Sequence, residues 1–464
     1  MNASTSTTIR RADRVPLAVL GLALLFAGGS QIVGRIAADG PSEPGAADDI
    51  GQASVGAEFL ALAPGATDLE RIRANVDFWS ERARANPRDF VSSTRWAASE
   101  IDLARATSDV TRYVAANEAL DTALAANPDY RLAGAYRGAV LVALHEFAEA
   151  RTTARAVLAN NSADPAALAT LGDAALALGD MDEARGAYQQ LSLVADSAAA
   201  RVRRSHLAFV DGDPAAAVEA SRSAVTAAVE EQLEGTELAW YRYQLGDTLA
   251  ATGDLEGARA SFEEGLRNDP NSPLAQWGLA RVAAAAKDWD TAMDHLDAAI
   301  AVIPSPEYVA RRADIYRLRG APGDDRRERE DRRTVLAIGQ LAGEASGVYD
   351  RTLSLYLSST GEDPARALRL AEAELVARKD IYGYDALAWA LLANARADEA
   401  RAQMAEALAL GTRDAKLLYH AGMIEAALGN DAAARGYLED ALATDPSFDP
   451  LAVRTARPTL AELD

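Results

Sequence analysis

The chain has 464 residues, of which 49% are hydrophobic, 6% are aromatic and none is cysteine, so disulfides, thiol catalysis and thiolate metal sites are excluded. The 69 acidic and 47 basic side chains leave a formal net charge of -22, which repels a phosphate backbone, and we expect no nucleic-acid partner. Abundant Ala, Leu, Arg and Glu, without runs of β-branched residues, predict an all-α fold.

The N-terminus has the charge pattern of a membrane-targeting segment. Residues 1–14 carry Arg10, Arg11 and Arg14, an apolar stretch runs from Val15 to about Gly34 within the segment 15–36, and acidic residues follow Arg35. This asymmetry is typical of a cytoplasmic N-terminus with the remainder exported. The stretch predicts a transmembrane anchor or a cleaved signal sequence; its length favours the anchor, but both alternatives stay open. We therefore expect a single-pass protein of the cell membrane with its main part extracytoplasmic, or a secreted or periplasmic protein after cleavage.

A second segment, residues 37–67, is rich in Gly, Ala and Pro and has no sustained apolar periodicity. This composition predicts a flexible linker between the apolar stretch and the remainder of the chain.

Beyond the linker, the chain repeats itself. Residues 171–191 read LGDAALALGDMDEARGAYQQL and residues 245–265 read LGDTLAATGDLEGARASFEEG. Each contains a helix of small residues that ends at Gly-Asp, followed by a second helix in which an alanine precedes an aromatic residue by four positions. We expect Gly172 and Gly246 to let the helices approach closely, and the aromatic residues, Tyr188 and Phe262, to fill the space beside them.

The alanine of the second helix recurs along the chain, mostly at intervals of 33 or 34 residues. The series is Ala116, Ala150, Ala184, Ala217, Ala258, Ala292, Ala367, Ala400 and Ala434. A proline stands twelve residues after the alanine in several repeats, where it ends the second helix.

In these small and bulky positions, and in its period, the sequence resembles the tetratricopeptide repeat family. The resemblance implies a right-handed α-solenoid of about nine to ten helix-turn-helix repeats behind an N-terminal transmembrane or signal helix. The implied layout is an N-terminal array at 68–305, a degenerate repeat with a charged insertion at 306–347, a C-terminal array at 348–446 and a capping helix at 447–464. The charged run at 324–333 is either a solvated helix or an insertion that binds a partner.

The sequence contains no recognised catalytic or metal-binding pattern. The four histidines, His145, His206, His295 and His420, have no spacing typical of metal ligands, and no phosphate-binding loop or nucleophile elbow occurs. We therefore expect no enzyme activity of this chain's own and no cofactor.

The resemblance also implies that the first helix of each repeat lines a concave face. Residues expected to be exposed there, and to bind an extended peptide or a partner helix, are Trp240, Tyr243, Trp277, Arg281, Tyr382, Trp389 and Tyr419. The alternative, that several of the aromatics pack between repeats, stays open. The Lys and Asn clamp of the chaperone-binding members is absent.

Together these features predict a protein–protein interaction scaffold on the outer side of the cytoplasmic membrane, which binds a protein or peptide partner. Two alternatives remain. The chain could be a non-catalytic accessory or regulatory subunit of an envelope enzyme or transporter complex, or it could associate with copies of itself.

Overall fold

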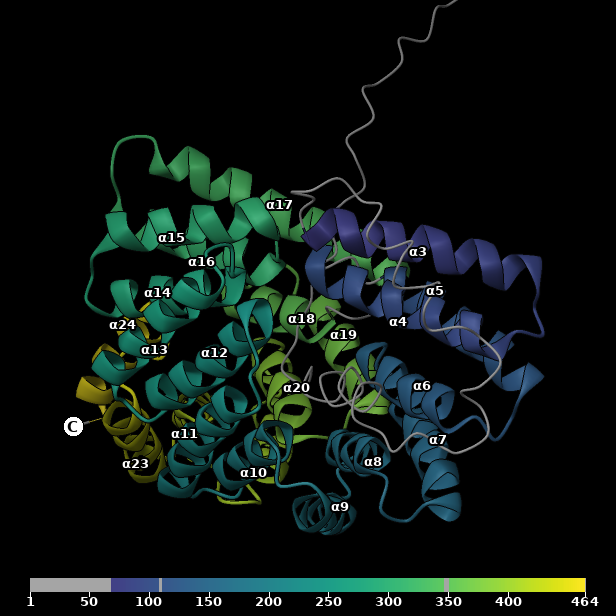
Figure 1. The fold of residues 1–464 in the computed structure, drawn as a ribbon. Helices are drawn as coiled ribbons and strands as arrows, with labels where there is room; N and C mark the ends of the chain where they lie inside the picture. The colour runs from purple at the N-terminus through teal and green to yellow at the C-terminus, as the bar shows by residue number, and fades with distance from the viewer. Residues whose placement is uncertain (1–67, 108–110, 346–349, 464) are drawn as a thin grey trace, which may run out of the picture.

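The computed structural model describes residues 68–107, 111–345 and 350–463, in which every regular element is a helix (Figure 1). Helix α3 (Asp68–Ala85) comes first, ten helix pairs follow, and α24 (Pro450–Glu462) comes last. The pairs are α4 (Phe90–Thr107) with α5 (Thr111–Ala126), α6 (Arg131–Ala143) with α7 (Phe147–Asn160), α8 (Pro165–Ala177) with α9 (Met181–Val194), α10 (Ala198–Val210) with α11 (Pro214–Glu230), α12 (Gly235–Ala251) with α13 (Leu255–Asn268), α14 (Pro273–Ala285) with α15 (Trp289–Val302), α16 (Pro306–Arg319) with α17 (Asp324–Ala345), α18 (Asp350–Thr360) with α19 (Pro364–Ala377), α20 (Ile381–Ala393) with α21 (Ala397–Ala407), and α22 (Ala415–Ala427) with α23 (Asp431–Thr444). The predicted all-α repeat fold is confirmed.

The N-terminal predictions fall outside this part of the chain. Both the apolar stretch at 15–36 and the linker at 37–67 lie outside the described residues. Of the helices that the structure does describe, none combines the length and the apolar character that crossing a bilayer requires.

The repeat register predicted from the alanines is confirmed. Every alanine of the series lies in the second helix of a pair and has no exposed surface. The bulky partners Tyr188, Phe262 and Leu438 are buried as well, and they occupy the space where a Cβ on Gly172, Gly246 or Gly422 would lie. Close helix approach therefore depends on a glycine in one helix and a large side chain in the other.

The turn inside most pairs closes the first helix with a left-handed residue. At Gly179, for example, the backbone N–H donates to the carbonyl of Leu176, and the next N–H, of Asp180, donates to Ala175. These two bonds form a Schellman motif, which satisfies carbonyls at the helix end. The Asp180 carboxylate then accepts from the N–H of Glu183 and begins α9. Only this half of a capping box forms, since the Asp180 N–H already donates to Ala175.

The charged run at 324–333 forms the first turns of α17, which packs against α16 as the second helix of a pair. Asp324 is buried and accepts hydrogen bonds from Arg319 at 2.9 and 3.0 Å. Within the run, Glu328 pairs with Arg332 at 2.9 Å. The run is therefore part of a repeat. At the other end, α24 continues through Pro458, although the sequence predicts a kink or a shortened helix there.

The solenoid coils far enough to meet itself, which the sequence did not predict. In Figure 1 the green and yellow C-terminal helices lie against the teal helices of the middle of the chain. The N–H of Lys379 donates to the carbonyl of Ala177 at 2.8 Å, and the Thr412 hydroxyl lies 3.4 Å from the carbonyl of Phe209. We call this contact between 145–212 and 378–412 the inter-turn seam.

Candidate binding surface

Four of the seven residues predicted to bind a partner are buried, so their expected exposure was wrong. These are Trp240, Tyr243, Trp277 and Tyr419. Each ring packs against a neighbouring aromatic residue; the ring centroids of Trp277 and Tyr308 are 5.2 Å apart, for example. The physical reason is that the first helices of successive repeats also contact one another, and large rings fill the gaps between them.

The two other predicted aromatics are half-buried. Trp389 stacks on His420 with ring centroids 4.1 Å apart, and its indole N–H donates to the Ser359 hydroxyl at 3.0 Å. Tyr382 lies at the inter-turn seam, and burial raises the pKa of its hydroxyl well above the ordinary value. Only Tyr382 of the predicted set contributes to the pocket described below.

The last predicted residue, Arg281, is held by an ion pair with Asp247 of the preceding repeat. Burial by itself lowers the pKa of the Arg281 guanidinium, but the Asp247 carboxylate outweighs it, so the pKa is raised and the charge is retained. Its charge is therefore already matched inside the protein.

The same link occurs elsewhere between successive first helices. Asp173 of α8 accepts two hydrogen bonds from Arg203 of α10, at 2.7 and 2.8 Å, and both side chains are buried. Asp385 of α20 likewise accepts from His420 of α22 at 2.7 Å, if the ring carries its proton on Nδ1. The signal in the sequence was the Asp of the two Leu-Gly-Asp triplets, Asp173 and Asp247, each followed by an Arg 30 or 34 residues later.

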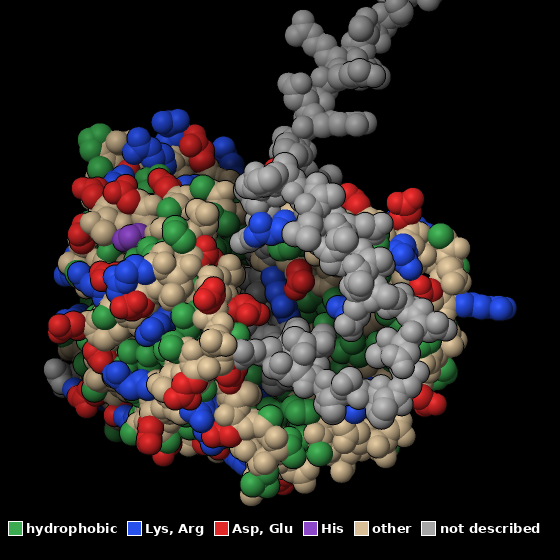
Figure 2. All heavy atoms as spheres, in the orientation of Figure 1, with side chains coloured by type: hydrophobic (Ala, Val, Ile, Leu, Met, Phe, Trp, Pro, Cys, Tyr) green, Lys and Arg blue, Asp and Glu red, His purple; other side chains and the backbone are tan. Residues whose placement is uncertain are grey.

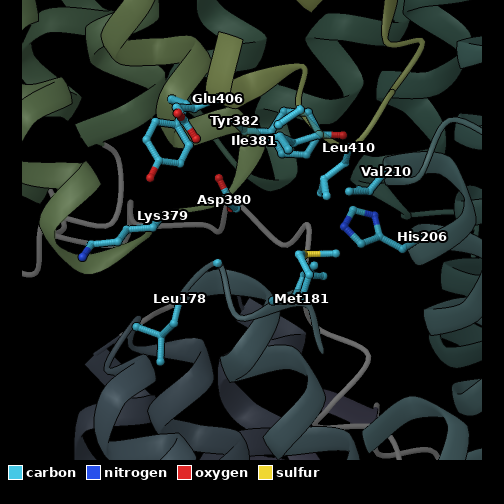
Figure 3. A pocket seen from close by; sticks show the side chains of 14 residues that line it. Leu178, Met181, His206, Val210, Lys379, Asp380, Ile381, Tyr382, Glu406 and Leu410 are labelled. Atoms are coloured by element: carbon cyan, nitrogen blue, oxygen red, sulfur yellow. The ribbon is translucent and has the colours of Figure 1, made fainter. Parts of the chain in front are cut away.

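A pocket of about 330 Å³ opens at the inter-turn seam (Figure 3). One wall comes from the end of α8, the start of α9 and α10. The other wall comes from the start of α20 and the end of α21. The lining residues are Leu176, Leu178, Gly179, Met181, His206 and Val210 on the first wall, and Lys379, Asp380, Ile381, Tyr382, Tyr384, Glu406, Ala409 and Leu410 on the second. The lining is mainly apolar, with a few convergent polar groups, which is the usual character of a binding pocket.

The polar groups of the pocket have distinct positions. Lys379 and Glu406 are exposed and place opposite charges at the rim. Asp380 is buried, and its carboxylate has partners inside the protein. It caps α20 by accepting from the N–H of Gly383 at 2.7 Å, and it also accepts from Arg351 at 2.8 Å. Such a pocket can hold an apolar side chain, while its rim meets polar or charged neighbours of that side chain.

His206 lies in the first wall, on the side of the pocket opposite Asp380 (Figure 3). Burial lowers the pKa of its imidazole, although the carboxylates of Asp380, Asp173 and Asp247 oppose this effect. The ring is therefore neutral near pH 7. It offers a polar edge to the pocket without adding a charge.

A second contact between distant repeats lies near α24. Arg311 of α16 donates to Asp449, the N-cap of α24, at 2.8 Å. Asp314, one turn along α16, has its pKa raised to about 7 because it is buried and because Asp449 is close, although Arg311 opposes the shift.

One face of the described repeats shows no large patch of a single charge sign (Figure 2). On the face shown in Figure 2, acidic and basic side chains are intermingled over the described repeats. Within the described residues, no three His, Asp or Glu side chains are grouped as metal ligands would be.

Sequence reasoning missed most of the pocket, notably Met181, His206, Val210 and Leu410. These residues lie in or near turns of repeats that are about 200 positions apart. No motif in the sequence connects the two groups, because their proximity arises from the coiling of the whole array.

Comparison with known proteins supports the repeat assignment. A tetratricopeptide repeat family model matches residues 137–200, 170–231, 243–308 and 386–447. No curated protein matches the sequence.

Several solved structures align with this chain. A thermophilic TPR protein of Thermus thermophilus is 18% identical, with 41% of this chain and 99% of that chain covered and a TM-score of 0.35. Yeast Tom70 is 14% identical, with coverages of 88% and 95% and a TM-score of 0.33. A human IFIT1 dimer with m7Gppp-AAAA is 15% identical, with coverages of 80% and 85% and a TM-score of 0.44.

Proposed function

Because this chain is a tetratricopeptide repeat protein, we propose that it is a protein-interaction scaffold that holds a segment of a partner protein at the inter-turn seam. The observation that carries the proposal is the pocket of about 330 Å³, whose two walls come from opposite sides of the seam. The repeats position these two walls, and the role proposed for the chain is to bind the partner segment between them.

The chemistry of the pocket favours a large apolar side chain as the anchor of the bound segment. Met181, Val210, Ile381 and Leu410 provide apolar contacts, and burial of such an anchor is the main source of affinity at many interfaces. Lys379 and Glu406 at the rim would face the polar residues on either side of the anchor.

The proposal replaces the row of concave-face aromatics as the main binding determinant. Trp277 and Tyr419 are packed within the repeats, so their removal would damage the scaffold before it affected a partner. Tyr382 is retained in the proposed site because it lines the pocket.

We further propose that residues 15–36 anchor the array in the cytoplasmic membrane, with the repeats on the outer side. The supporting observation is the sequence asymmetry, with Arg10, Arg11 and Arg14 before the apolar stretch and acids after it. Recovery of an intact N-terminal peptide from the membrane fraction would support the anchor. A mature protein that begins beyond residue 28 would instead show cleavage.

The scaffold proposal is tested by filling the pocket. Ala409 is exposed and lines the pocket, so Ala409→Trp places a large ring in it. Ala432, in the first turn of α23, is also exposed but does not line the pocket, and Ala432→Trp is the matched control. We expect in-cell crosslinking and affinity recovery from native membranes to capture a defined partner with the wild type and the control, and to lose it with Ala409→Trp.

Equal helicity of the two variants by circular dichroism would exclude unfolding as the cause of the loss. The pocket is not the binding site if Ala409→Trp recovers the same partner as the wild type. Recovery of only the chain itself would instead support self-association.

A further inference from the structure

The inter-turn seam contains a histidine in an unusual position. His145 forms the turn between α6 and α7, and its Nε2 lies 2.7 Å from a terminal guanidinium nitrogen of Arg378, 233 positions away in the chain. The ring also stacks on Phe147 with centroids 5.4 Å apart, and Arg378 lies over the Phe147 ring at 5.1 Å. His145 and Phe147, on one side of the seam, thus hold the guanidinium of Arg378 from the other side.

The backbone at His145 is in the left-handed region, with φ at 63°. The equivalent turn position is glycine in several other pairs, at Gly179, Gly212, Gly253 and Gly429, where the left-handed conformation carries little cost. A side chain at this position is less favourable, since its Cβ crowds the neighbouring backbone when φ is positive. The imidazole at 145 therefore stands where the turn by itself favours glycine.

The hydrogen bond requires a neutral imidazole. A guanidinium has only N–H donors and stays charged in proteins, so Arg378 must donate and His145 Nε2 must accept. An imidazole that accepts at Nε2 carries its single proton on Nδ1. Protonation of Nε2 would place two donors and two positive charges face to face.

The charges around this contact are balanced only while His145 is neutral. Arg378 and Arg351 of α18 are the cations of the cluster, and Glu374 of α19 and Asp380 are the anions. Three of these four side chains, Glu374, Arg378 and Asp380, are buried. A fifth charge on His145 would leave the cluster with an unmatched positive charge.

We propose that His145 is a proton-sensitive clasp: as a neutral acceptor it holds Arg378 and keeps the two turns of the superhelix closed, and its protonation in mildly acidic solution opens the seam. The N–H of Lys379, which donates to Ala177 across the seam, is the next residue after Arg378 and moves with it. The opening itself is independent of any partner. Its effect on the pocket, whose walls lie on opposite sides of the seam, rests on the proposed function.

The direction of the pH effect follows from the shifted equilibrium. Burial, with Arg378 and Arg351 nearby, lowers the pKa of His145 well below its usual 6.5. The open form, in which the ring is solvated, takes up a proton near pH 6.5, whereas the closed form resists it. The ratio of closed to open molecules therefore falls by up to about tenfold for each pH unit below 6.5, until the closed form also protonates.

The clasp is tested by a distance measurement across the seam. The chain has no cysteine, so Leu193→Cys and Val376→Cys, two highly exposed positions on α9 and α19, carry a pair of spin labels without background. We expect pulsed electron spin resonance on the full-length chain in detergent to give a single distance between the labels at pH 7.5 and a second, longer distance whose population grows at pH 5. Return to pH 7.5 should restore the first.

Two variants of His145 separate charge from shape. Asparagine tolerates positive φ and can accept from Arg378 but does not titrate, so His145→Asn should stay closed at both pH values. Lysine already occupies the equivalent turn at Lys287, with φ at 59°, so the turn tolerates this side chain. Because lysine is positively charged at pH 7.5 and cannot accept from Arg378, His145→Lys should be open at that pH. His206→Asn, which changes the other histidine of the seam, should keep the wild-type pH response.

The clasp is excluded if the distance between the labels in the wild type is the same at pH 5 as at pH 7.5. It is excluded as well if lowering the pH to 5 opens His145→Asn as readily as the wild type. It is also excluded if His206→Asn abolishes the response. Should the wild type lose helicity at pH 5, the decisive result is His145→Lys at pH 7.5. A closed seam in that folded variant would overturn the proposal.

Discussion

Gly172 of α8 lies so close to Tyr188 of α9 that a Cβ added at position 172 would be 2.2 Å from Cε1 of the ring. Tyr188 cannot move away easily, because its hydroxyl donates to the buried Asp173 at 2.8 Å. This pair shows how a repeat joins its two helices, with a missing side chain on one and a fixed ring on the other.

The first prediction concerns this contact. Gly172→Ala should destabilise the protein by about 1–3 kcal/mol, because the added methyl group overpacks the helix pair. Gly186 of α9 has no atom near its added Cβ, so Gly186→Ala should be neutral or stabilise by up to about 1 kcal/mol through helix propensity. Urea unfolding followed by circular dichroism checks both; equal effects would show that the repeat tolerates the methyl group.

The second prediction concerns the buried pair of Asp173 with Arg203. Arg203→Met leaves a buried carboxylate without its countercharge, which should lower the free energy of unfolding by about 3–5 kcal/mol. Arg267, which pairs with Glu264 on the surface of α13, is the control, and Arg267→Met should change little. The same unfolding assay applies. If the two variants were equally stable, the buried link between successive first helices would have no role in stability.

The third prediction separates the seam from the turn geometry. Gly212 and Gly361 both have positive φ, but an added Cβ at 212 would be 2.0 Å from the carbonyl oxygen of Gly411, whereas at 361 it would meet nothing. Alanine at either position carries the left-handed cost of about 1 kcal/mol. Gly212→Ala should therefore lower the free energy of unfolding more than Gly361→Ala does. It should also lengthen the distance between spin labels at positions 193 and 376 at pH 7.5. A normal distance in Gly212→Ala would mean that the seam adjusts without opening.

The fourth prediction concerns Asp314, whose pKa is raised from 3.8 to about 7. The folded protein binds this proton more tightly than the unfolded chain, so the ionisation of Asp314 lowers stability as the pH rises from 3.8 to about 7. Asp314→Asn removes that ionisation. Its stabilising effect should be about 1–2 kcal/mol larger at pH 8 than at pH 5, measured by urea unfolding against the wild type. If the effect of Asp314→Asn on the free energy of unfolding does not change with pH, the folded protein does not disfavour the ionised carboxylate of Asp314.

The sequence predicted what neighbouring helices determine. The alanine series, the glycine contacts and the Asp-Pro helix starts depend on residues within about 40 positions, and a short repeating pattern records them. The start of α11 is an example, since Asp213 caps the helix by accepting from the N–H of Ala216 and Pro214 is its first residue, so three consecutive residues determine it.

The sequence could not predict where the array meets itself. Small rotations between successive repeats add up over the whole solenoid, and no single residue records the sum. His145, Met181 and Leu410 therefore looked unrelated in the sequence, although the first lies at the seam and the other two share a pocket. The predicted exposure of the aromatics was wrong for a related reason. Trp240 and Trp277 occupy positions that look exposed when one repeat is considered alone, but neighbouring repeats bury them.

A linear array of repeats frays from its ends, since an end repeat has a neighbour on one side only. The seam changes this for the repeats that it joins. The pairs α8/α9 and α10/α11 gain a third neighbour in the stretch from Lys379 to Thr412, and that stretch gains them. Loss of either partner then exposes the other, so two stretches of chain that are about 200 residues apart should open and close as a single unit.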